Sequence, residues 1–271
     1  MLFAVVAVAA VAASTGGGHP HATHPHATHR AAVRPAPPKP DPTVLAVQRV
    51  MAETPVIRVG GPWHRYVALT FDDGPSPYTA ELVHVLERRH APATFFQVGR
   101  MIPVFGAGAR AANRAGFPVG DHTQDHPPLA ALGPAAQQSE IVDAIAHMRI
   151  VGEPRPTLFR PPYMSYNATT VGLMRRLRML MVLWTVDSED YRLPGVSAIV
   201  YRVLSGAQPG AIVLMHDGGG PRSETVAAVP LIIDALRRRH YQLVTVPELL
   251  LKDPPIPSKQ RAGGAGLSRA G

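Results

Sequence analysis

The chain contains no cysteine, and this absence excludes several classes of site at once. Without a thiol there is no disulfide framework, no thiolate metal site and no cysteine nucleophile. Cysteine usage therefore also says nothing about the redox compartment in which the protein works.

The apolar run at the N-terminus is too short to cross a bilayer. Residues 2–13 are twelve apolar residues, whereas a transmembrane helix needs about 20. The small, alanine-rich run and the small-x-small pattern at 10–12 are typical of a signal peptide, but no Lys or Arg precedes them. A mis-assigned start would explain this and would also permit a longer anchor. We expect residues 1–15 to direct secretion or anchoring outside the cytoplasmic membrane, with a cytoplasmic protein as the alternative.

The sequence shows no segment in which basic and aromatic residues alternate, as in surfaces that bind nucleic-acid bases. The formal net charge is +8, but residues 60–250 carry 18 Lys and Arg against 16 Asp and Glu. The flanks hold the other nine cations against three acids. Such flanks suit loose attraction to an anionic wall polymer or to lipid head groups. We therefore expect association with a cell wall or membrane surface and no nucleic-acid partner. The sequence does not indicate an oligomeric state.

The flanks also differ from the centre in composition. His-Pro-His-Ala-Thr occurs at 19–23 and again at 24–28, and residues 34–42 are rich in proline. We predict a His- and Pro-rich linker over 16–59, with metal storage by its histidines as the alternative. From about residue 252 the composition turns to Pro, Gly, Ala and basic residues, which predicts a disordered tail over 252–271. The remaining residues, 60–251, are enough for one sizeable catalytic domain.

Short apolar runs alternate with longer amphipathic segments in this central region. The expected strands are 66–71, 93–98, 117–119, 157–160, 181–186, 211–216 and 242–246. The expected helices are 79–89, 107–115, 135–151, 168–178, 196–204 and 225–239. This alternation predicts an α/β fold with parallel strands and right-handed crossovers. About seven such units favour a barrel over an open sheet, and either fold gathers the working residues at the carboxyl ends of the strands.

Two adjacent carboxylates, Asp72 and Asp73, end the first of these strands. A Gly-Pro turn follows them directly. Since neighbouring residues on a strand point to opposite sides, the two acids can do different work. The alternative is an ordinary solvated Asp-Asp-Gly turn.

Two histidines four residues apart, His122 and His126, follow the run that ends near 120. On one face of a helical turn they would hold a single metal ion. With Asp73 they would make a two-histidine, one-carboxylate set that leaves positions open for water and substrate. Unrelated surface histidines at this spacing are the alternative.

Three further strand ends carry chemically active side chains. Arg160 is followed by Pro161 and Pro162, which stiffen the backbone, so that a fixed guanidinium can orient a carboxylate. The first free amide after the prolines, that of Tyr163, could stabilise an oxyanion. His216 ends a fully apolar run and becomes a proton donor if a carboxylate such as Asp187 supports it. Singly, each could be a structural residue at the edge of the core.

Taken together, these segments resemble the polysaccharide deacetylases of carbohydrate esterase family four, also called the NodB-homology domain. The resemblance covers about 66–250 and five motifs in the family's order, at 70–75, 122–126, 160–163, 187–191 and 214–216. It implies a distorted (β/α) barrel and one divalent metal, usually zinc but in some members cobalt, nickel or manganese. It also implies removal of acetyl groups from an acetylated polysaccharide.

The resemblance assigns roles to the residues of the first two motifs. Asp72 matches the catalytic base. Asp73, His122 and His126 match the metal ligands. Thr123 matches the small hydroxyl residue that steadies the loop between the histidines.

The other three motifs supply the remaining roles. Arg160 matches the arginine that orients the base, His216 matches the catalytic acid, and Asp187 matches the acid that tunes this histidine. The residues expected to bind substrate are Tyr163 through its amide, Leu214 in the pocket for the acetyl methyl group, Tyr191 and Pro162.

The sequence departs from the family's pattern at three positions. Tyr191 stands where tryptophan is usual, so that a groove wall is smaller or more polar. Asp121 stands where asparagine is common, which would add negative charge near the metal. Met164 stands where glycine is frequent, which would narrow the entrance of the cleft. All three bear on substrate preference.

The expected activity is therefore metal-dependent N-deacetylation of N-acetylglucosamine residues in peptidoglycan or a chitin-like polymer. The same site could cleave O-acetyl esters on xylan or another glycan. A third hypothesis is that the protein is a non-catalytic wall-binding module. Such a module is expected to lack a metal ligand or the base, and none is missing here.

Overall fold

The computed structural model describes residues 41–257. The leader predicted at 1–15, most of the predicted linker and the end of the predicted tail lie outside these residues. Between residues 41 and 257, no helix is long and apolar enough to cross a membrane.

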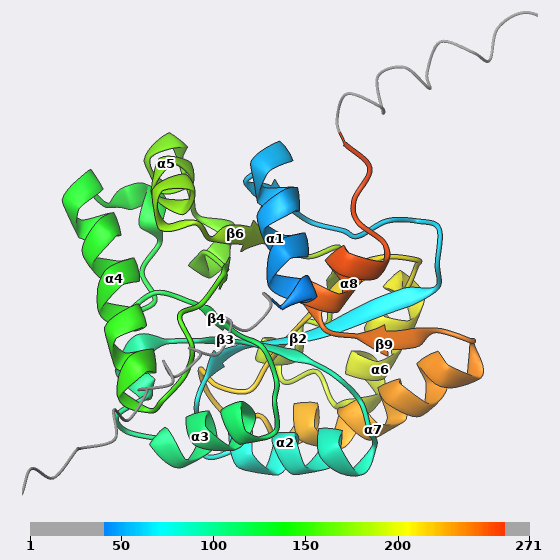
Figure 1. Cartoon of the computed structure of the whole chain (residues 1–271). Coiled ribbons are helices and arrows are strands. Elements are labelled where there is room, and N and C mark those ends of the chain that lie inside the picture. The colour runs from blue at the N-terminus through cyan, green and yellow to red at the C-terminus, as the bar shows by residue number, and fades with distance from the viewer. Residues whose placement is uncertain (1–40, 258–271) are drawn as a thin grey trace, which may run out of the picture. The chain divides into compact units, whose positions relative to one another are not determined.

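Parallel strands form the centre of the structure (Figure 1). The strands are β1 (Val56–Ile57), β2 (Tyr66–Gly74), β3 (Thr94–Gln97), β4 (Val119–Asp121), β5 (Leu158–Phe159), β6 (Leu180–Val182), β7 (Val186–Asp187), β8 (Ala211–His216) and β9 (Gln242–Val244). Their order is β1-β6-β5-β4-β3-β2-β8-β7, and β9 pairs with the amino-terminal half of β2. Each of these pairings is parallel. The sheet curls into a distorted (β/α) barrel with surrounding helices, which confirms the predicted fold class.

The helices follow the strands in the order that the alternation predicts. They are α1 (Pro42–Glu53), α2 (Thr79–Arg88), α3 (Gly106–Arg114), α4 (Pro134–Ile150), α5 (Ala168–Leu177), α6 (Val196–Gly206), α7 (Ser223–Arg238) and α8 (Val246–Lys252). Short 3-10 turns lie at Gly99–Met101, Leu129–Ala131, Pro162–Met164 and Asp190–Arg192.

The structure corrects several predicted boundaries. The strand predicted over 181–186 is two strands, β6 and β7, and β4 begins two residues later than predicted. The predicted linker extends too far, because its last part forms α1 and β1. The predicted tail begins too early: Asp253 is buried, and its carboxylate accepts a hydrogen bond from the His64 amide at 2.8 Å.

The central strand β2 separates two apolar clusters by the alternation of its side chains. Val67, Leu69 and Phe71 pack with apolar residues of α2, α6 and α7. Ala68 belongs to the other cluster, which contains residues of α1 and α8. Since side chains alternate along a strand, Thr70 and Asp72 continue the side of Ala68 and point toward the inside of the barrel.

Helices α1 and α8, from opposite ends of the described chain, lie side by side over this second cluster (Figure 1). Val47 of α1 and Leu249 of α8 are almost fully buried there. Asp41 caps α1 by accepting from the Thr43 amide at 2.8 Å, and Pro42 occupies the first turn. A reciprocal cap between Thr245 and Glu248 begins α8. The two helices close the amino-terminal side of the domain, away from the strand ends that carry the motif residues.

Candidate active site

Asp72 and Arg160 form a buried ion pair at the carboxyl ends of β2 and β5. The Arg160 Nη1 group donates to Asp72 Oδ1 at 2.7 Å and to Thr70 Oγ1 at 2.8 Å, and Nε donates to the Val182 carbonyl at 2.9 Å. Asp72 is 2% exposed and Arg160 is fully buried. Burial lowers the pKa of Arg160, and the charge of Asp72 opposes this shift. One Asp72 oxygen is thus engaged, and the carboxylate is held in a single orientation.

Asp73 lies at an irregularity in β2 and has a left-handed backbone, with φ of 72°. The register with β3 shifts between Asp72 and Gly74, as in a β-bulge. Strict alternation would have directed the two carboxylates to opposite faces. Instead His122 Nε2 lies 3.7 Å from Asp72 Oδ2 and 3.4 Å from Asp73 Oδ1. The bulge therefore brings both acids to one site, which alternation alone does not predict.

The two motif histidines meet, although not on a helical turn as their spacing predicted. They lie in the loop after β4, where Thr123 and His126 have positive φ of 69° and 63°. The His126 amide donates to Thr123 Oγ1 at 3.1 Å, and the Thr123 amide donates to Asp121 Oδ1 at 2.7 Å. These contacts hold the loop in a conformation that non-glycine residues rarely adopt. The two imidazole centroids are 4.9 Å apart.

The donor atoms of Asp73, His122 and His126 converge. One ligand atom from each lies within 4.8 Å of the others, and His126 Nε2 is 3.0 Å from Asp73 Oδ1. Asp73 Oδ1 is buried and has no hydrogen-bond partner in the described part of the chain. Burial raises the pKa of Asp73, but the two histidines outweigh this and hold the pKa well below its ordinary value.

The outer nitrogens of both histidines are already bonded. His122 Nδ1 contacts the Arg160 carbonyl at 2.6 Å, and His126 Nδ1 contacts the Tyr163 hydroxyl at 3.1 Å. A proton on each Nδ1 leaves the Nε2 lone pair directed at Asp73, as metal-ligating histidines require. Together with the orphaned carboxylate oxygen, this donor set fits one divalent metal of the zinc type with open positions. The arrangement does not select among zinc, cobalt, nickel and manganese.

His216 ends β8 and is paired with Asp190, which corrects the expected pairing with Asp187. His216 Nδ1 lies 2.7 Å from Asp190 Oδ1, and the His216 amide donates to Asp190 Oδ2 at 2.8 Å. The 3-10 turn after β7 directs Asp190 inward, where it is fully buried and also accepts from Thr225 Oγ1 at 2.7 Å. Asp187 instead accepts from the Glu189 amide at 2.8 Å.

The pair shifts the pKa values of both its members. Burial lowers the pKa of His216, but the hydrogen bond to Asp190 and its charge outweigh burial and raise the pKa to about 9. Burial raises the pKa of Asp190, and His216 reverses this and lowers it. Burial raises the pKa of Asp187, although the Glu189 amide opposes it. A protonated imidazole at the edge of the cleft can donate a proton at neutral pH.

Asp121, which stands where asparagine is common, directly precedes the first of the two histidines. The side chain is fully buried beside His122. Burial raises its pKa well above the ordinary value, and the Thr123 amide only partly opposes this. Burial thus works against a negative charge at this position, whereas the Thr123 amide favours it.

These groups surround a cleft of about 620 Å³. Its lining includes the expected Tyr163, Tyr191 and Leu214, whereas the proline that lines it is Pro161 and not the predicted Pro162. The Tyr191 ring meets His216 edge-on at 5.4 Å and is 42% exposed, so that it can form a wall. The lining residues and contacts that the motif analysis did not assign to the site are Arg100, Trp184, Gly219, Arg222 and, behind His216, Asp190.

The sequence indicated some of the cleft residues in advance and gave no indication of others. Asp190 lies within the acidic segment 187–191, but spacing alone does not say which acid turns inward. Met164 was expected at the entrance and does line the cleft, where Arg58 Nη1 contacts its sulfur at 3.4 Å. No spacing signal indicates Arg222, which follows three glycines and a proline after His216.

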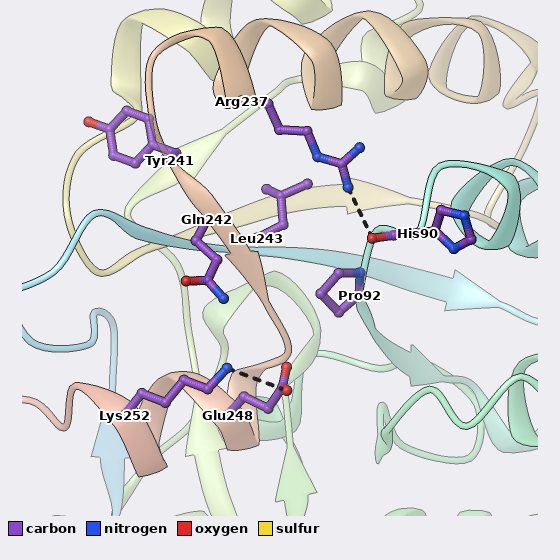
Figure 2. Close-up of a pocket in the computed structure, with 8 residues that line it drawn as sticks. All are labelled: His90, Pro92, Arg237, Tyr241, Gln242, Leu243, Glu248 and Lys252. Atoms are coloured by element: carbon purple, nitrogen blue, oxygen red, sulfur yellow. Dashed lines mark hydrogen bonds and ion pairs between the residues drawn. The ribbon is translucent and has the colours of Figure 1, made fainter.

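A second pocket, of about 470 Å³, lies on other elements and carries no comparable chemistry (Figure 2). Its basic side chains have partners within the pocket. Arg237 donates to the His90 carbonyl at 3.0 Å, and the Lys252 ammonium lies 3.7 Å from a Glu248 oxygen. The cleft at the strand ends is therefore the candidate active site.

Comparison with known proteins identifies the class of fold and site. The polysaccharide deacetylase family model matches residues 61–182. A chitooligosaccharide deacetylase from a Bradyrhizobium strain is 35% identical over 198 residues, which cover 68% of this chain and 90% of that protein. The chain therefore belongs to the polysaccharide deacetylase family.

Solved structures agree with this membership. A crystal structure of a peptidoglycan N-acetylglucosamine deacetylase has a TM-score of 0.69 at 28% identity and covers 72% of this chain and 92% of its own. A family-four carbohydrate esterase pseudoenzyme from Bacillus anthracis has a TM-score of 0.68 at 27% identity, covering 72% and 68% of the two chains. Since a pseudoenzyme shares the fold, activity must be argued from the side chains of the site.

Proposed function

We propose that the protein is a metal-dependent polysaccharide N-deacetylase that releases acetate from N-acetylated amino sugars of a cell-wall-type glycan, either peptidoglycan or a chitin-like polymer. The observation that carries the proposal is the convergence, on one cleft, of the Asp73, His122 and His126 donor atoms with two differently supported groups. These are Asp72 held by Arg160 and His216 held by Asp190. The named activities of the relatives support an amide of this kind as the substrate.

Asp73, His122 and His126 would hold the metal. A bound divalent ion supplies Lewis acidity, which lowers the pKa of water and polarises a carbonyl oxygen. Zinc is our first choice, because two imidazoles and one carboxylate are a common zinc set, with cobalt, nickel or manganese as substitutes.

Asp72 acts as the general base. Its Oδ1 is held by Arg160, and its Oδ2 faces His122 and the ligand site. As a water oxygen adds to the acetyl carbonyl carbon, Asp72 accepts one proton of that water. The ion pair with Arg160 fixes the direction of the carboxylate, so that proton transfer needs no reorientation.

His216 acts as the general acid on the other side of the cleft. Its proton passes to the amide nitrogen as the carbon–nitrogen bond breaks, so that the sugar leaves as an amine and the acetyl group as acetate. The Tyr163 amide donates to the carbonyl oxygen while that oxygen carries negative charge. Leu214, 4% exposed in the lining, receives the acetyl methyl group.

Acetate release tests the proposal. Purified protein with added zinc should release acetate from peptidoglycan or chitin oligomers, and a chelator should stop the reaction. Asp72→Asn should lower turnover at least about 10²-fold, because the base is lost. Asp234→Asn is the control and should change turnover little, because this partly exposed acid of α7 pairs with Arg89 and does not line the cleft. Substantial turnover in Asp72→Asn would remove Asp72 as the base.

O-acetyl ester hydrolysis is the neighbouring function, because the same base and acid can act on an ester. Acetate release from acetylated xylan compared with N-acetylated oligomers separates the two activities. A non-catalytic wall-binding module is the alternative of another class, and the pseudoenzyme relative makes it concrete. Binding to wall polymer without acetate release under every metal condition would favour that alternative.

We also propose that the protein works outside the cytoplasmic membrane and contacts the wall or membrane through its basic flanks. The apolar residues 2–13 and the flanking excess of Lys and Arg support this location. Fractionation of cells that express the full chain tests it: recovery in the cytosol alone would contradict the location.

A further inference from the structure

Arg222 is a buried cation without an acidic partner. It is 3% exposed, and its guanidinium donates to two neutral carbonyls, from Nε to Gly218 and from Nη1 to Pro221, each at 2.7 Å. Within residues 41–257, no carboxylate lies within 4.0 Å of it. Residues 1–40 and 258–271 contain no Asp or Glu at all. No acidic side chain of this protein therefore neutralises Arg222.

A buried charge of this kind is unfavourable unless an opposite charge compensates it. The protein follows this rule at Arg160, which is fully buried and paired with Asp72 at 2.7 Å. The carbonyls of Gly218 and Pro221 satisfy two donor groups of Arg222 but do not cancel its charge. Its other three N–H groups, one on Nη1 and two on Nη2, make no hydrogen bond within residues 41–257. A buried guanidinium with free donor groups is suited to bind a carboxylate.

Arg222 lines the active-site cleft, and the loop before it approaches the metal ligands directly. Gly219 packs so closely against Asp73 Oδ2 that any side chain at this position would overlap it, so this segment lies against the ligand site. Arg100, exposed on the turn after β3, also lines the cleft and makes no ion pair in the described chain. The neighbouring acids lie against other groups, Asp72 at 2.7 Å from Arg160 and Asp73 at 3.0 Å from His126. Two uncompensated cations thus face the space where substrate would lie.

We propose that Arg222, assisted by Arg100, forms a carboxylate subsite that selects amino sugars bearing a carboxylate beside the acetamido group, as N-acetylmuramic acid does. Arg222 supplies the buried, directed contact, and Arg100 supplies positive charge at the rim. This inference rests on the proposed deacetylase function and adds a substrate class to it. The acetate product is also a carboxylate, so the test must separate the substrate's own carboxylate from the product.

The test compares two matched substrates. One is a glycan of alternating N-acetylglucosamine and N-acetylmuramic acid, and the other is the same glycan with its carboxyl groups reduced to alcohols. Deacetylation of each type of unit is resolved by mass spectrometry. The enzymes are the full chain loaded with zinc, Arg222→Gln, Arg222→Lys and Arg100→Gln, with Arg149→Gln on the exposed face of α4 as the control.

Loss of the charge at Arg222 should act on the acidic substrate alone. For muramic acid units, Arg222→Gln should lower kcat/KM about tenfold or more, chiefly through KM, because a charge-assisted hydrogen bond is lost. For the reduced glycan the change should be less than about twofold by the same reasoning. Arg222→Lys loses the two hydrogen bonds to the Gly218 and Pro221 carbonyls but keeps the positive charge. Because the charge remains, this variant should retain the preference for the acidic glycan. Arg100→Gln should show a smaller loss in the same direction, and Arg149→Gln none.

Other outcomes would overturn the proposal. Equal losses on both glycans in Arg222→Gln would make the arginine a clamp for the Gly218–Pro221 loop only. In another contrary outcome, added acetate inhibits the wild-type enzyme and not Arg222→Gln while both prefer the same glycan. That result would place the acetate product, and not the substrate, at Arg222. If the wild-type enzyme deacetylates neither glycan, the proposed function fails separately. Calorimetric binding of the two glycans to wild type and Arg222→Gln then decides the subsite, and equal affinities would reject it.

Discussion

At the scale of single residues, the acid that supports His216 decides how the site depends on pH. Asp190 and Asp187 lie three residues apart, yet only Asp190 reaches the imidazole, at 2.7 Å. This contact raises the pKa of His216 to about 9 against the effect of burial. The protonated form is therefore present at neutral pH and is lost as the pH rises through about 9.

Asp190→Asn should move the alkaline limb of the kcat profile to lower pH by about two units. Without the Asp190 carboxylate, only the charges of Asp73 and Asp72 oppose burial, so the pKa of His216 falls and less of the acid is protonated at neutral pH. Turnover measured from pH 5 to 10 checks this. Asp187→Asn is the matched control and should leave the limb where it is. A limb that moves with Asp187 and not with Asp190 would reverse the pairing.

His126→Ala should remove bound metal as well as activity. Of the three donor atoms that converge, two would remain, and one imidazole plus one carboxylate hold a divalent ion weakly. Metal content per chain after dialysis against zinc-free buffer is the measurement, and it should fall by one ion. Any metal held by the histidines at 19–29 is the same in both chains. His84→Ala, an exposed histidine of α2, is the control. Unchanged metal content in His126→Ala would contradict the ligand assignment.

At the scale of elements, α1 and α8 hold the barrel together from the side opposite the site. Val47 and Leu249 pack in one cluster with Ala68 and Val244 of the sheet. Since Ala68 lies on β2, which also carries Asp72, this packing also supports the strand of the proposed base. The two helices therefore belong to the folded domain, although their sequences lie in or next to the predicted flanks.

Leu249→Ala should destabilise the domain by about 2–5 kcal/mol, because a fully buried leucine leaves a cavity between α8, α1 and the sheet. Leu251→Ala lies on the same helix but is 41% exposed, and its cost should be below about 1 kcal/mol. The midpoint of urea unfolding by circular dichroism distinguishes the two variants. Equal midpoints would mean that α8 does not pack as described.

At the scale of the whole molecule, one buried acid links stability to pH. Glu153, after α4, is 4% exposed, and neither of its carboxylate oxygens has a hydrogen-bond partner among residues 41–257. Burial raises its pKa to about 7, and Gln97 opposes the shift only partly. Because the folded-state pKa lies above the unfolded value, the stability that this group contributes is present below about pH 4.5. It is lost as the pH rises through about 7.

Glu153→Gln should therefore stabilise the protein at alkaline pH relative to wild type. The shift corresponds to about 3 kcal/mol of unfolding free energy at pH 8, and almost none of this difference should remain at pH 4.5. Urea unfolding at the two pH values gives the comparison. Glu81→Gln, on the exposed face of α2, should show no such dependence. A Glu153→Gln variant that gains nothing at pH 8 would show that the carboxylate is compensated.

Much of this molecule is determined by local sequence pattern. Strand and helix alternation predicted the parallel sheet, because the hydrophobic periods of the two elements differ. Five motifs indicated which strand ends bear chemistry, since the carboxyl ends of parallel strands share one edge. The sequence also contains a start signal for α1, because Asp41-Pro42 is a capping pair. The prediction of a linker over 16–59 missed this helix, because the residues before the capping pair are rich in proline.

Only the tertiary structure decided how the site residues meet. The bulge at Asp73 depends on pairing with β3, the loop that joins His122 and His126 depends on contacts to Asp121, and neither is a local preference. The choice of Asp190 over Asp187 arises from the turn after β7, and the uncompensated charge of Arg222 exists only because the fold buries it. Burial and the partners that a side chain meets are properties of the packed chain. Spacing along the sequence therefore names the chemical groups, while packing determines their pairing.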